Sequence, residues 1–270
     1  MTDFAASSAA DSEQGRLAVA LRGVTKTFDS GVMALGPLDL DVRTGEFVSL
    51  LGPSGCGKST ALRVIAGLSA PSRGEVNVSR RTHGRARHAI GFVFQEPTLM
   101  PWTSVRENVR LPLKLARLGK ADADARIAEA LTRVGLADFA AAFPRELSGG
   151  MKMRVSLARA LLTEPDILLM DEPFAALDEI TRFRLNDDLL LLWRNLRKTV
   201  IFVTHSVFES VYLSQRVVVM TERPGRIGAE IKIDMDVPRN EELRTSVVYA
   251  DHCRRVSAAL APSYSQRSSL

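Results

Sequence analysis

Phosphate chemistry is indicated by nine consecutive residues that satisfy the pattern G-x-x-x-x-G-K-[ST]: Gly52, Pro53, Ser54, Gly55, Cys56, Gly57, Lys58, Ser59 and Thr60. Gly55 and Gly57 lack a β-carbon, so the backbone can curl with its N–H groups pointing inward at phosphate oxygens. Lys58 would place a cation on the β- and γ-phosphates, and the Ser59 hydroxyl would coordinate Mg²⁺. The run predicts a site for a nucleoside triphosphate. The alternative is a glycine-rich turn that binds nothing.

Two carboxylates, Asp171 and Glu172, follow the apolar run 167–170, which indicates a buried strand. Ligands of parallel sheets lie at such strand ends. Asp171 would hold Mg²⁺ through its water shell, and Glu172 is placed to orient or deprotonate the water that attacks the γ-phosphate. In isolation an Asp-Glu pair is as often an ordinary turn. Behind a phosphate loop, the pair favours a catalytic site.

A second anion site is predicted at residues 147–151, where Ser148, Gly149 and Gly150 precede a helical pattern over 152–162. Ser148 can cap the helix, and the glycines let a ligand approach the backbone closely. The free N–H groups of the helix start complement negative charge. The alternative is a flexible capped turn.

The elements that must position these residues follow an α/β pattern. Strands are predicted near residues 17–22, 46–51, 90–94, 166–170, 199–203 and 216–220, and residues 61–66 indicate the helix that leaves the phosphate loop. The signal changes to helix over about 97–160, with apolar spacings of three and four in 123–134 and 152–162. We therefore expect a disordered leader over 1–16, an α/β domain over 17–235 with a helical insertion, and a tail over 236–270 with one amphipathic helix near 241–260.

The composition limits the class of protein. The chain has 270 residues, 46% of them hydrophobic, enough for a globular core. Its net charge of +5 with mixed signs is weak support for nucleic-acid binding, and the basic stretch 80–88 is interpreted as a solvated turn rather than an anion or nucleic-acid site. We expect no secretory signal and no membrane span. Cys56 and Cys253 offer no disulfide framework or metal cluster, which fits a reducing cytoplasm.

Taken together, these residues resemble the ATP-binding cassette of ABC transporters, from about Leu17 to about Ile231. The matches come in family order: Phe28, the phosphate loop at 52–60, Gln95, the signature at 147–151, Asp171 with Glu172, residues 176–178, and His205. The resemblance implies a P-loop NTPase (RecA-like) core with a mainly parallel sheet, antiparallel N-terminal strands and an inserted helical subdomain. It also implies an ATPase that uses ATP and Mg²⁺.

The resemblance gives four further residues a role. Phe28 would stack on adenine, and Gln95 would contact Mg²⁺ or the attacking water. His205 would hold the γ-phosphate by a hydrogen bond, and Asp178 would lie at the contact between two cassettes. Each residue also has a plainer alternative, in the same order a core phenylalanine, a surface glutamine, a structural histidine and a helix cap.

In this family two cassettes pack head to tail, so that the signature of one closes over the ATP on the phosphate loop of the other. The chain holds one cassette, so we expect a homodimer. Met151 and Met153 stand where Gln is frequent, and Ser206 stands where Asp is frequent. These departures leave the rate of the expected ATPase open.

The segment 95–108, which includes Trp102, resembles the region of importer cassettes that receives the coupling helix of the membrane subunit. With 207–216 and 223–227, it looks most like the nitrate, sulfonate, taurine and bicarbonate importer group. The resemblance implies two transmembrane permease subunits and a periplasmic or extracytoplasmic solute-binding protein. It also implies a peripheral position on the cytoplasmic face of the inner (plasma) membrane. The alternative for 96–108 is a surface loop with one anchoring tryptophan.

Two other classes compete with a transporter. An ABC-type ATPase acting on nucleic acid or ribosomes usually has a cassette split by coiled coils, or two cassettes, and neither feature is present. A phosphate-loop kinase or GTPase would lack the signature at 147–151. We therefore expect no direct contact with nucleic acid. The transported solute stays open.

Overall fold

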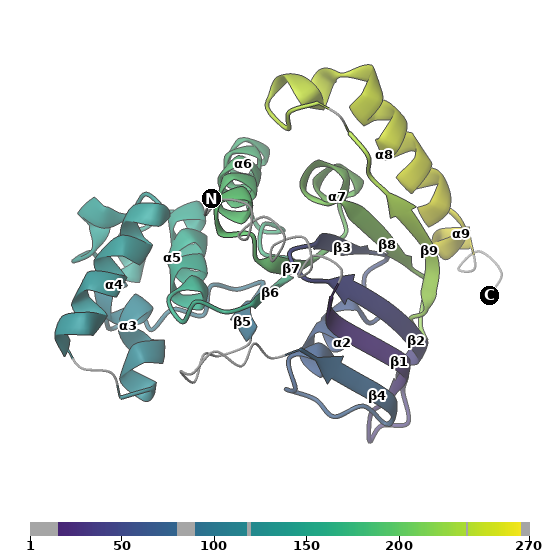
Figure 1. Cartoon of the computed structure of the whole chain (residues 1–270), viewed down its shortest axis with the longest axis horizontal. Helices are drawn as coiled ribbons and strands as arrows, with labels where there is room; N and C mark the ends of the chain where they lie inside the picture. The colour runs from purple at the N-terminus through teal and green to yellow at the C-terminus, as the bar shows by residue number, and fades with distance from the viewer. Residues whose placement is uncertain (1–15, 80–89, 118–119, 236, 266–270) are drawn as a thin grey trace, which may run out of the picture. The chain divides into compact units, whose positions relative to one another are not determined.

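The computed structural model describes residues 16–79, 90–117, 120–235 and 237–265 (Figure 1). The predicted leader up to residue 15 and the basic stretch 80–88 lie outside these residues. The chain divides into two compact units. Unit 1 comprises Met1–Arg80 and Arg197–Leu270, and unit 2 comprises Arg81–Leu196.

Four strands form the central sheet of unit 1 in the order β7-β3-β8-β9: β3 (Phe47–Leu51), β7 (Thr199–Thr204), β8 (Arg216–Met220) and β9 (Ile227–Lys232). β3 pairs in parallel with β7 and with β8, whereas β9 is antiparallel to β8. Every residue of β3 and β7 is buried, as expected for apolar runs in a parallel sheet covered on both faces. Helices α2 (Lys58–Ile65) and α7 (Val207–Leu213) contact these strands.

A second, antiparallel sheet of unit 1 has the order β2-β1-β4, from strands β1 (Leu17–Thr27), β2 (Met33–Arg43) and β4 (Arg73–Val78) (Figure 1). In β2, Leu38, Leu40 and Val42 are buried, and Asp39 and Asp41 between them are exposed. This period of two is what a strand with one solvated face requires.

The chain ends in unit 1 with the turn η3 (Glu242–Thr245) and helices α8 (Val247–Leu260) and α9 (Pro262–Ser265). The predicted start of the tail helix near 241 is wrong, because Ser246 is the N-cap of α8. Its Oγ accepts a hydrogen bond from the backbone N–H of Tyr249 at 3.2 Å. α8 contacts α7, β8 and β9.

Unit 2 contains two parallel strands, β5 (Ile90–Val93) and β6 (Ile167–Asp171). Its described helical elements are α3 (Val105–Leu115), α4 (Lys120–Arg133), η1 (Ala137–Phe139), η2 (Pro144–Glu146), α5 (Gly149–Leu161) and α6 (Glu179–Leu196). α3, α4 and α5 contact one another, and an ion pair of 2.8 Å joins Arg106 of α3 to Asp124 of α4. The helices of the predicted insertion thus form a packed group.

The six strands predicted by residue range are confirmed. The resemblance implied antiparallel N-terminal strands without giving the positions of β2 and β4, and β9 was not predicted. β2 contains Gly36 and Pro37, two residue types that are depleted in strands. A β-carbon at position 36 would lie 2.7 Å from Nε of Arg226, so a larger residue there would have to displace the Arg226 side chain. β4 and β9 are at the edges of their sheets and half or more of their residues are exposed. Such strands have a weak hydrophobic pattern.

In the part of the chain that the structure describes, every helix is too short or too polar to cross a membrane.

Candidate nucleotide site

The phosphate loop leaves β3 and leads directly into α2, as the motif requires. Gly55 and Gly57 both have positive φ, 79° and 105°, which is the left-handed region that favours glycine. A β-carbon on Gly57 would also lie 2.7 Å from the carbonyl oxygen of Ala34 in β2. Position 57 therefore requires glycine for its backbone conformation and for its packing.

Lys58 is the first residue of α2 and is 4% exposed. Its Nζ donates hydrogen bonds to the carbonyl oxygens of Gly52 at 2.8 Å and Pro53 at 2.9 Å. These bonds fold the side chain back over the loop that it follows. The ammonium is thereby held at the loop, where phosphate oxygens would find a cation together with the N–H groups of a helix start.

The register of β3 and β7 places His205 and the phosphate loop at the same end of the sheet, where the carboxyl ends of these strands lie. Leu51 pairs with Thr204 in parallel, so Gly52 and His205 are the next residues on two neighbouring strands. His205 is exposed, and the residues around it fix the turn in which it lies. The Thr204 hydroxyl donates to Glu209 Oε2 at 2.5 Å and accepts from the backbone N–H of Ser206 at 3.0 Å.

Ser206 also caps α7, because its Oγ accepts from the backbone N–H of Glu209 at 3.3 Å. An aspartate, which is frequent at this position in the family, is an equally good cap. Ser206 therefore keeps the local geometry of His205 without the carboxylate.

Arg223 contacts the phosphate loop, a role that the sequence did not predict. Its guanidinium donates from Nε at 3.1 Å and from Nη2 at 3.0 Å to the carbonyl oxygen of Gly55. Gly225 packs so closely that a β-carbon there would collide with the carbonyl oxygen of Cys56. The segment after β8 thus supports the phosphate loop from one side and adds a positive charge beside it.

Phe28 lies in the turn between β1 and β2, where its backbone bonds Val32 and Gly31. Its side chain is 44% exposed, and Lys26 Nζ lies 5.6 Å from the ring centroid. The core alternative for Phe28 is therefore wrong. An exposed ring on a fixed turn is what stacking on a base requires.

In unit 2, the register of β5 and β6 brings Gln95 and the two carboxylates to the carboxyl ends of these two neighbouring strands. Val93 pairs with Met170, and Gln95 and Glu172 each lie two residues farther along. Asp171 is buried at 7% exposure, and Glu172 has a φ of 45°. A non-glycine residue in the left-handed region is strained. Glu164, outside the site, has a φ of 50°, so the strain by itself does not mark Glu172 as functional.

The signature begins α5. Ser148 is its N-cap, and Ser148 Oγ accepts from the backbone N–H of Met151 at 3.3 Å. Ser148 and Gly149 are exposed, whereas Gly150 is buried, and a β-carbon on Gly150 would lie 2.7 Å from Cγ2 of Thr181 in α6. The structure therefore gives Gly150 a packing reason that the motif alone did not reveal.

Leu177, which precedes Asp178 in the sequence, lies beside the signature, because a β-carbon on Gly149 would lie 3.1 Å from Leu177 Cδ2. Asp178 Oδ1 accepts from the backbone N–H of Thr181 at 2.9 Å, and this bond lowers the pKa of the Asp178 carboxyl. The carboxylate thus caps the start of α6, which is the plainer of its two predicted roles. It is also exposed, so the cap leaves a face of the side chain accessible.

The segment after Gln95 is held by two residues that sequence reasoning missed. Arg159 of α5 donates to the carbonyl oxygens of Pro97 and Thr98, each at 2.9 Å, and burial lowers its pKa. Asn108 of α3 is fully buried. Its Oδ1 accepts from the backbone N–H of Met100 at 2.7 Å, and its Nδ2 donates to the carbonyl oxygen of Met100 at 3.1 Å. Asn108 lies on the buried face with Val105 and Val109, and that spacing was the available signal.

Trp102 sits on this fixed segment and is 75% exposed. A loop anchored by buried polar bonds does not need an apolar anchor of its own, and an exposed indole contributes nothing to the core. The alternative of an anchoring tryptophan is therefore wrong for the chain by itself.

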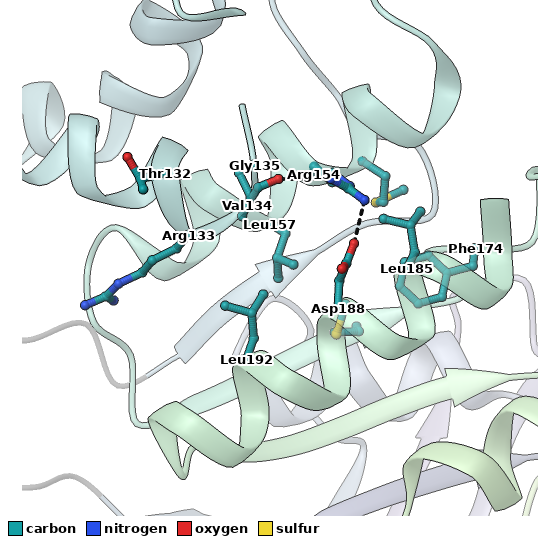
Figure 2. A pocket seen from close by; sticks show the side chains of 12 residues that line it. Thr132, Arg133, Val134, Gly135, Arg154, Leu157, Phe174, Leu185, Asp188 and Leu192 are labelled. Atoms are coloured by element: carbon teal, nitrogen blue, oxygen red, sulfur yellow. Dashed lines mark hydrogen bonds and ion pairs between the residues drawn. The ribbon is translucent and has the colours of Figure 1, made fainter. Parts of the chain in front are cut away.

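A cavity of about 250 Å³ lies elsewhere in unit 2 and is lined by none of the predicted site residues. Figure 2 shows Leu157, Leu185 and Leu192 around it, with Arg154 and Asp188 pointing toward one another. Arg154 Nη2 lies 2.5 Å from Asp188 Oδ2, so the pair ties α5 to α6. Burial raises the pKa of Asp188, and Arg154 opposes that rise. The buried Met153 also lines this cavity, so this departure from the family pattern is a packing residue.

The donors present fit Mg²⁺. Among the described residues, no group of three or more His, Cys, Asp or Glu could hold a metal alone. Mg²⁺ does not need one, because it is typically bound by one or two carboxylates, water and the phosphates of the substrate. Ser59 supplies a hydroxyl in unit 1 and Asp171 a buried carboxylate in unit 2, both hard oxygen donors.

Comparison with known proteins identifies the family of the chain. Residues 35–175 match the family model described as ABC transporter. The taurine import ATP-binding protein TauB of Rhizobium johnstonii is 47% identical over 203 residues, which cover 75% of this chain and 78% of that protein. The aliphatic sulfonates import ATP-binding protein SsuB of Bacillus cereus is 40% identical over 228 residues, 83% of this chain and 90% of that protein.

A solved structure gives the same answer for the fold. The ATP-binding cassette MJ0796, a dimer in a post-hydrolysis state bound to ADP and Pi, superposes with a TM-score of 0.70 at 36% identity, covering 80% of this chain and 99% of that one. The predicted α/β P-loop NTPase core, its antiparallel N-terminal strands and its inserted helices are confirmed. The chain is an ATPase, and it belongs to the ABC transporter family.

Proposed function

We propose that this chain is the ATP-hydrolysing subunit of a membrane importer for taurine, a sulfonate or a similar small solute. The names of its relatives support the solute class. The observation that carries the catalytic part is the pairing of Leu51 with Thr204, which starts the phosphate loop and His205 from neighbouring positions. ATPase chemistry requires a group that contacts the γ-phosphate beside the loop that binds it.

The residues of unit 1 bind the nucleotide. The loop from Gly52 to Thr60 surrounds the phosphates with backbone N–H groups, Lys58 neutralises the β- and γ-phosphates, and His205 donates a hydrogen bond to the γ-phosphate. Phe28 stacks on adenine, for about 1 to 3 kcal/mol by analogy with bases on aromatic side chains. Cys56 is a small buried residue of the loop.

The residues of unit 2 act on the water and the metal. Asp171 would hold Mg²⁺, to which the Ser59 hydroxyl of unit 1 would also be a ligand, and the ion would neutralise charge on the phosphates. Gln95 and Glu172 lie at one sheet edge, and Glu172 orients or deprotonates the attacking water while Gln95 contacts the metal or that water.

The chain works as a head-to-tail homodimer, in which Ser148, Gly149 and Gly150 of one copy close over the ATP of the other. The exposure of Ser148 and Gly149 at a helix start supports this arrangement. Asp178, the residue after Leu177, contacts the partner copy. Bound ATP links the two copies in the closed dimer, and its hydrolysis removes this link.

The partners of the dimer are two transmembrane permease subunits, with Trp102 and its loop as the contact, and an extracytoplasmic solute-binding protein. The chain itself lies on the cytoplasmic face of the inner (plasma) membrane as a peripheral subunit. We assign residues 17–235 to the ATPase domain, about 97–160 to its helical subdomain, and the chain beyond 235 to a C-terminal tail.

The variant Glu172→Gln tests the catalytic assignment. It is expected to bind ATP normally, to lower turnover by about 10² to 10⁴ and to accumulate as a dimer with ATP, measured by hydrolysis and by light scattering after size exclusion. Glu164→Gln, at an exposed residue outside the site, is the control. Normal hydrolysis by Glu172→Gln would remove Glu172 from the mechanism.

Purification from membranes tests the transporter assignment. We expect a hydrophobic multi-span partner to co-purify with the full chain. Stable binding of nucleic acid that weakens with salt, without such a partner, would instead support the ATPase class that acts on nucleic acid or ribosomes.

A further inference from the structure

Helix α7 carries the position of His205. Only Ser206 separates His205 from Val207, the first residue of the helix. Thr204 and Glu209, both buried, hold the turn by the bonds described above. Any displacement of α7 along or across β7 therefore moves the histidine.

The C-terminal segment holds α7 at both of its ends. At the first turn, the Tyr249 hydroxyl of α8 donates to the carbonyl oxygen of Phe208 at 2.9 Å. At the last turn, Arg239 donates to the carbonyl oxygens of Tyr212 at 2.9 Å and Ser214 at 2.6 Å. The last carbonyl groups of a helix have no hydrogen-bond donor within the helix, and Arg239 supplies one to the carbonyls of Tyr212 and Ser214.

Aromatic packing joins the same elements. The Tyr212 and Tyr249 rings meet edge to face with centroids 6.4 Å apart, and both residues are buried. Arg244 places its guanidinium carbon 3.9 Å from the centroid of Tyr212. Together with the hydrogen bonds, these contacts reach α7 near its start, at Phe208, and at its end, at Tyr212 and Ser214.

The C-terminal segment is itself attached to the sheet of unit 1. His252 Nε2 shares a hydrogen bond of 2.9 Å with the carbonyl oxygen of Asp234, just beyond β9. Leu243 and Val256 are buried, so η3 and α8 have apolar faces against the core of unit 1. A fastened element can transmit position, whereas a loose tail could not.

We propose that the C-terminal segment 239–253 is a positioning clamp that sets the placement of α7, and through it of His205, for ATP hydrolysis. This inference rests on the proposed contact of His205 with the γ-phosphate. Tyr249 and Arg239 are its positioning residues. They touch no nucleotide in this arrangement, and their effect on hydrolysis passes through the backbone of α7.

The test compares four variants of the full chain. Tyr249→Phe removes one hydroxyl and keeps the ring, and Arg239→Gln removes both bonds to the end of α7. Arg254→Gln on the same helix is the matched control, because Arg254 pairs only on the surface with Asp251 among the contacts described. His205→Ala supplies the background for a double-mutant cycle. Urea unfolding midpoints verify that each protein is folded.

We expect Tyr249→Phe and Arg239→Gln each to lower kcat about two- to tenfold, as the loss of one or two hydrogen bonds that hold a reacting group, with KM for ATP within twofold. Arg254→Gln is expected to equal the wild type. In the His205→Ala background, Tyr249→Phe is expected to have no further effect, because the clamp has nothing left to position.

Two results would overturn the clamp while leaving the role of His205 intact. One is an unchanged kcat in both variants, and the other is an equal additional loss from Tyr249→Phe when His205 is already absent. A merely structural role would give that second, additive result. If His205→Ala itself hydrolyses ATP at the wild-type rate, the proposed role of His205 is wrong and the clamp falls with it.

Discussion

Leu51 pairs in register with Thr204 across the parallel strands β3 and β7, and both strands are buried throughout. The residues that follow this pair are the first glycine of the phosphate loop and His205. A slip of register by one residue would turn every side chain of a strand to the other face of the sheet. The distance between loop and histidine is therefore set by the core and does not depend on a flexible connection.

Arg223→Gln is expected to weaken ATP binding about two- to tenfold. The guanidinium loses two hydrogen bonds to Gly55, and an exposed charge beside the phosphates is removed. Titration with a fluorescent ATP analogue measures the effect, and its dependence on salt should be smaller in the variant. Arg226→Gln is the control, because Arg226 is exposed and packs on Gly36 away from Gly55. Equal affinity of Arg223→Gln and wild type would contradict the prediction.

Gly150→Ala is expected to destabilise the chain by about 1 to 3 kcal/mol, because its β-carbon would overlap Thr181. Denaturation in urea measures the loss. Adding Thr181→Ser deletes the opposing methyl group, so the double variant should regain most of the stability. A double variant that stays destabilised would show that the packing explanation is wrong. Activity that stays low after stability returns would indicate a further role of Gly150 at the nucleotide.

The stability of the tail is expected to decrease in alkaline solution. Burial raises the pKa of the Cys253 thiol from 9.0 to about 11, and burial also raises the pKa of Tyr249. The native state keeps the thiol proton more tightly than the unfolded chain, so this stabilisation is complete below about pH 9 and is lost as the pH rises through 11. Urea midpoints at pH 8 and pH 10.5 measure it.

Cys253→Ala is the comparison for the alkaline loss. Its midpoint should fall less between the two pH values than that of the wild type, although the contribution of Tyr249 remains. An identical fall in both proteins would mean that ionisation of Cys253 does not contribute.

Trp102→Ala is expected to weaken assembly with the membrane partner by about 2 kcal/mol or more, about thirtyfold in affinity, as for a central aromatic residue of an interface. ATP affinity of the isolated chain should not change, because the fixed loop does not need the indole. Leu191→Ala, at another exposed apolar residue of unit 2, is the control. Loss of ATP binding with intact assembly would show that the segment has been misplaced.

The sequence predicted what local patterns encode. The phosphate loop, the strand before Asp171 and the helix start at Ser148 each depend on a few neighbouring residues, and their elements are where the motifs require them. The family resemblance implied a mainly parallel sheet, and β3 does pair in parallel with β7 and β8, but the order of these strands was not predicted. Helix α8 was found, but its start was misjudged because the capping role of Ser246 was not weighed against the preceding polar turn.

The parts that could not be foreseen depend on contacts between distant residues. Arg223 and Gly55 are separated by 168 positions, and nothing near either residue indicates the other. The packing of Gly150 against Thr181 and of Gly36 against Arg226 likewise requires two elements to meet. Asn108 was closer to detection, because a polar residue on an apolar helix face must find partners.

The buried amide of Asn108 and the guanidinium of Arg159 fix the backbone of the loop that carries Trp102, while the indole itself is left bare. Shape and recognition are thereby assigned to different residues. Under the proposed contact with the permease, replacing Trp102 would change the surface offered to that subunit without disturbing the frame of the loop, whereas replacing Asn108 would disturb the frame itself. The residue proposed to meet the permease can therefore change independently of the residues that hold the loop.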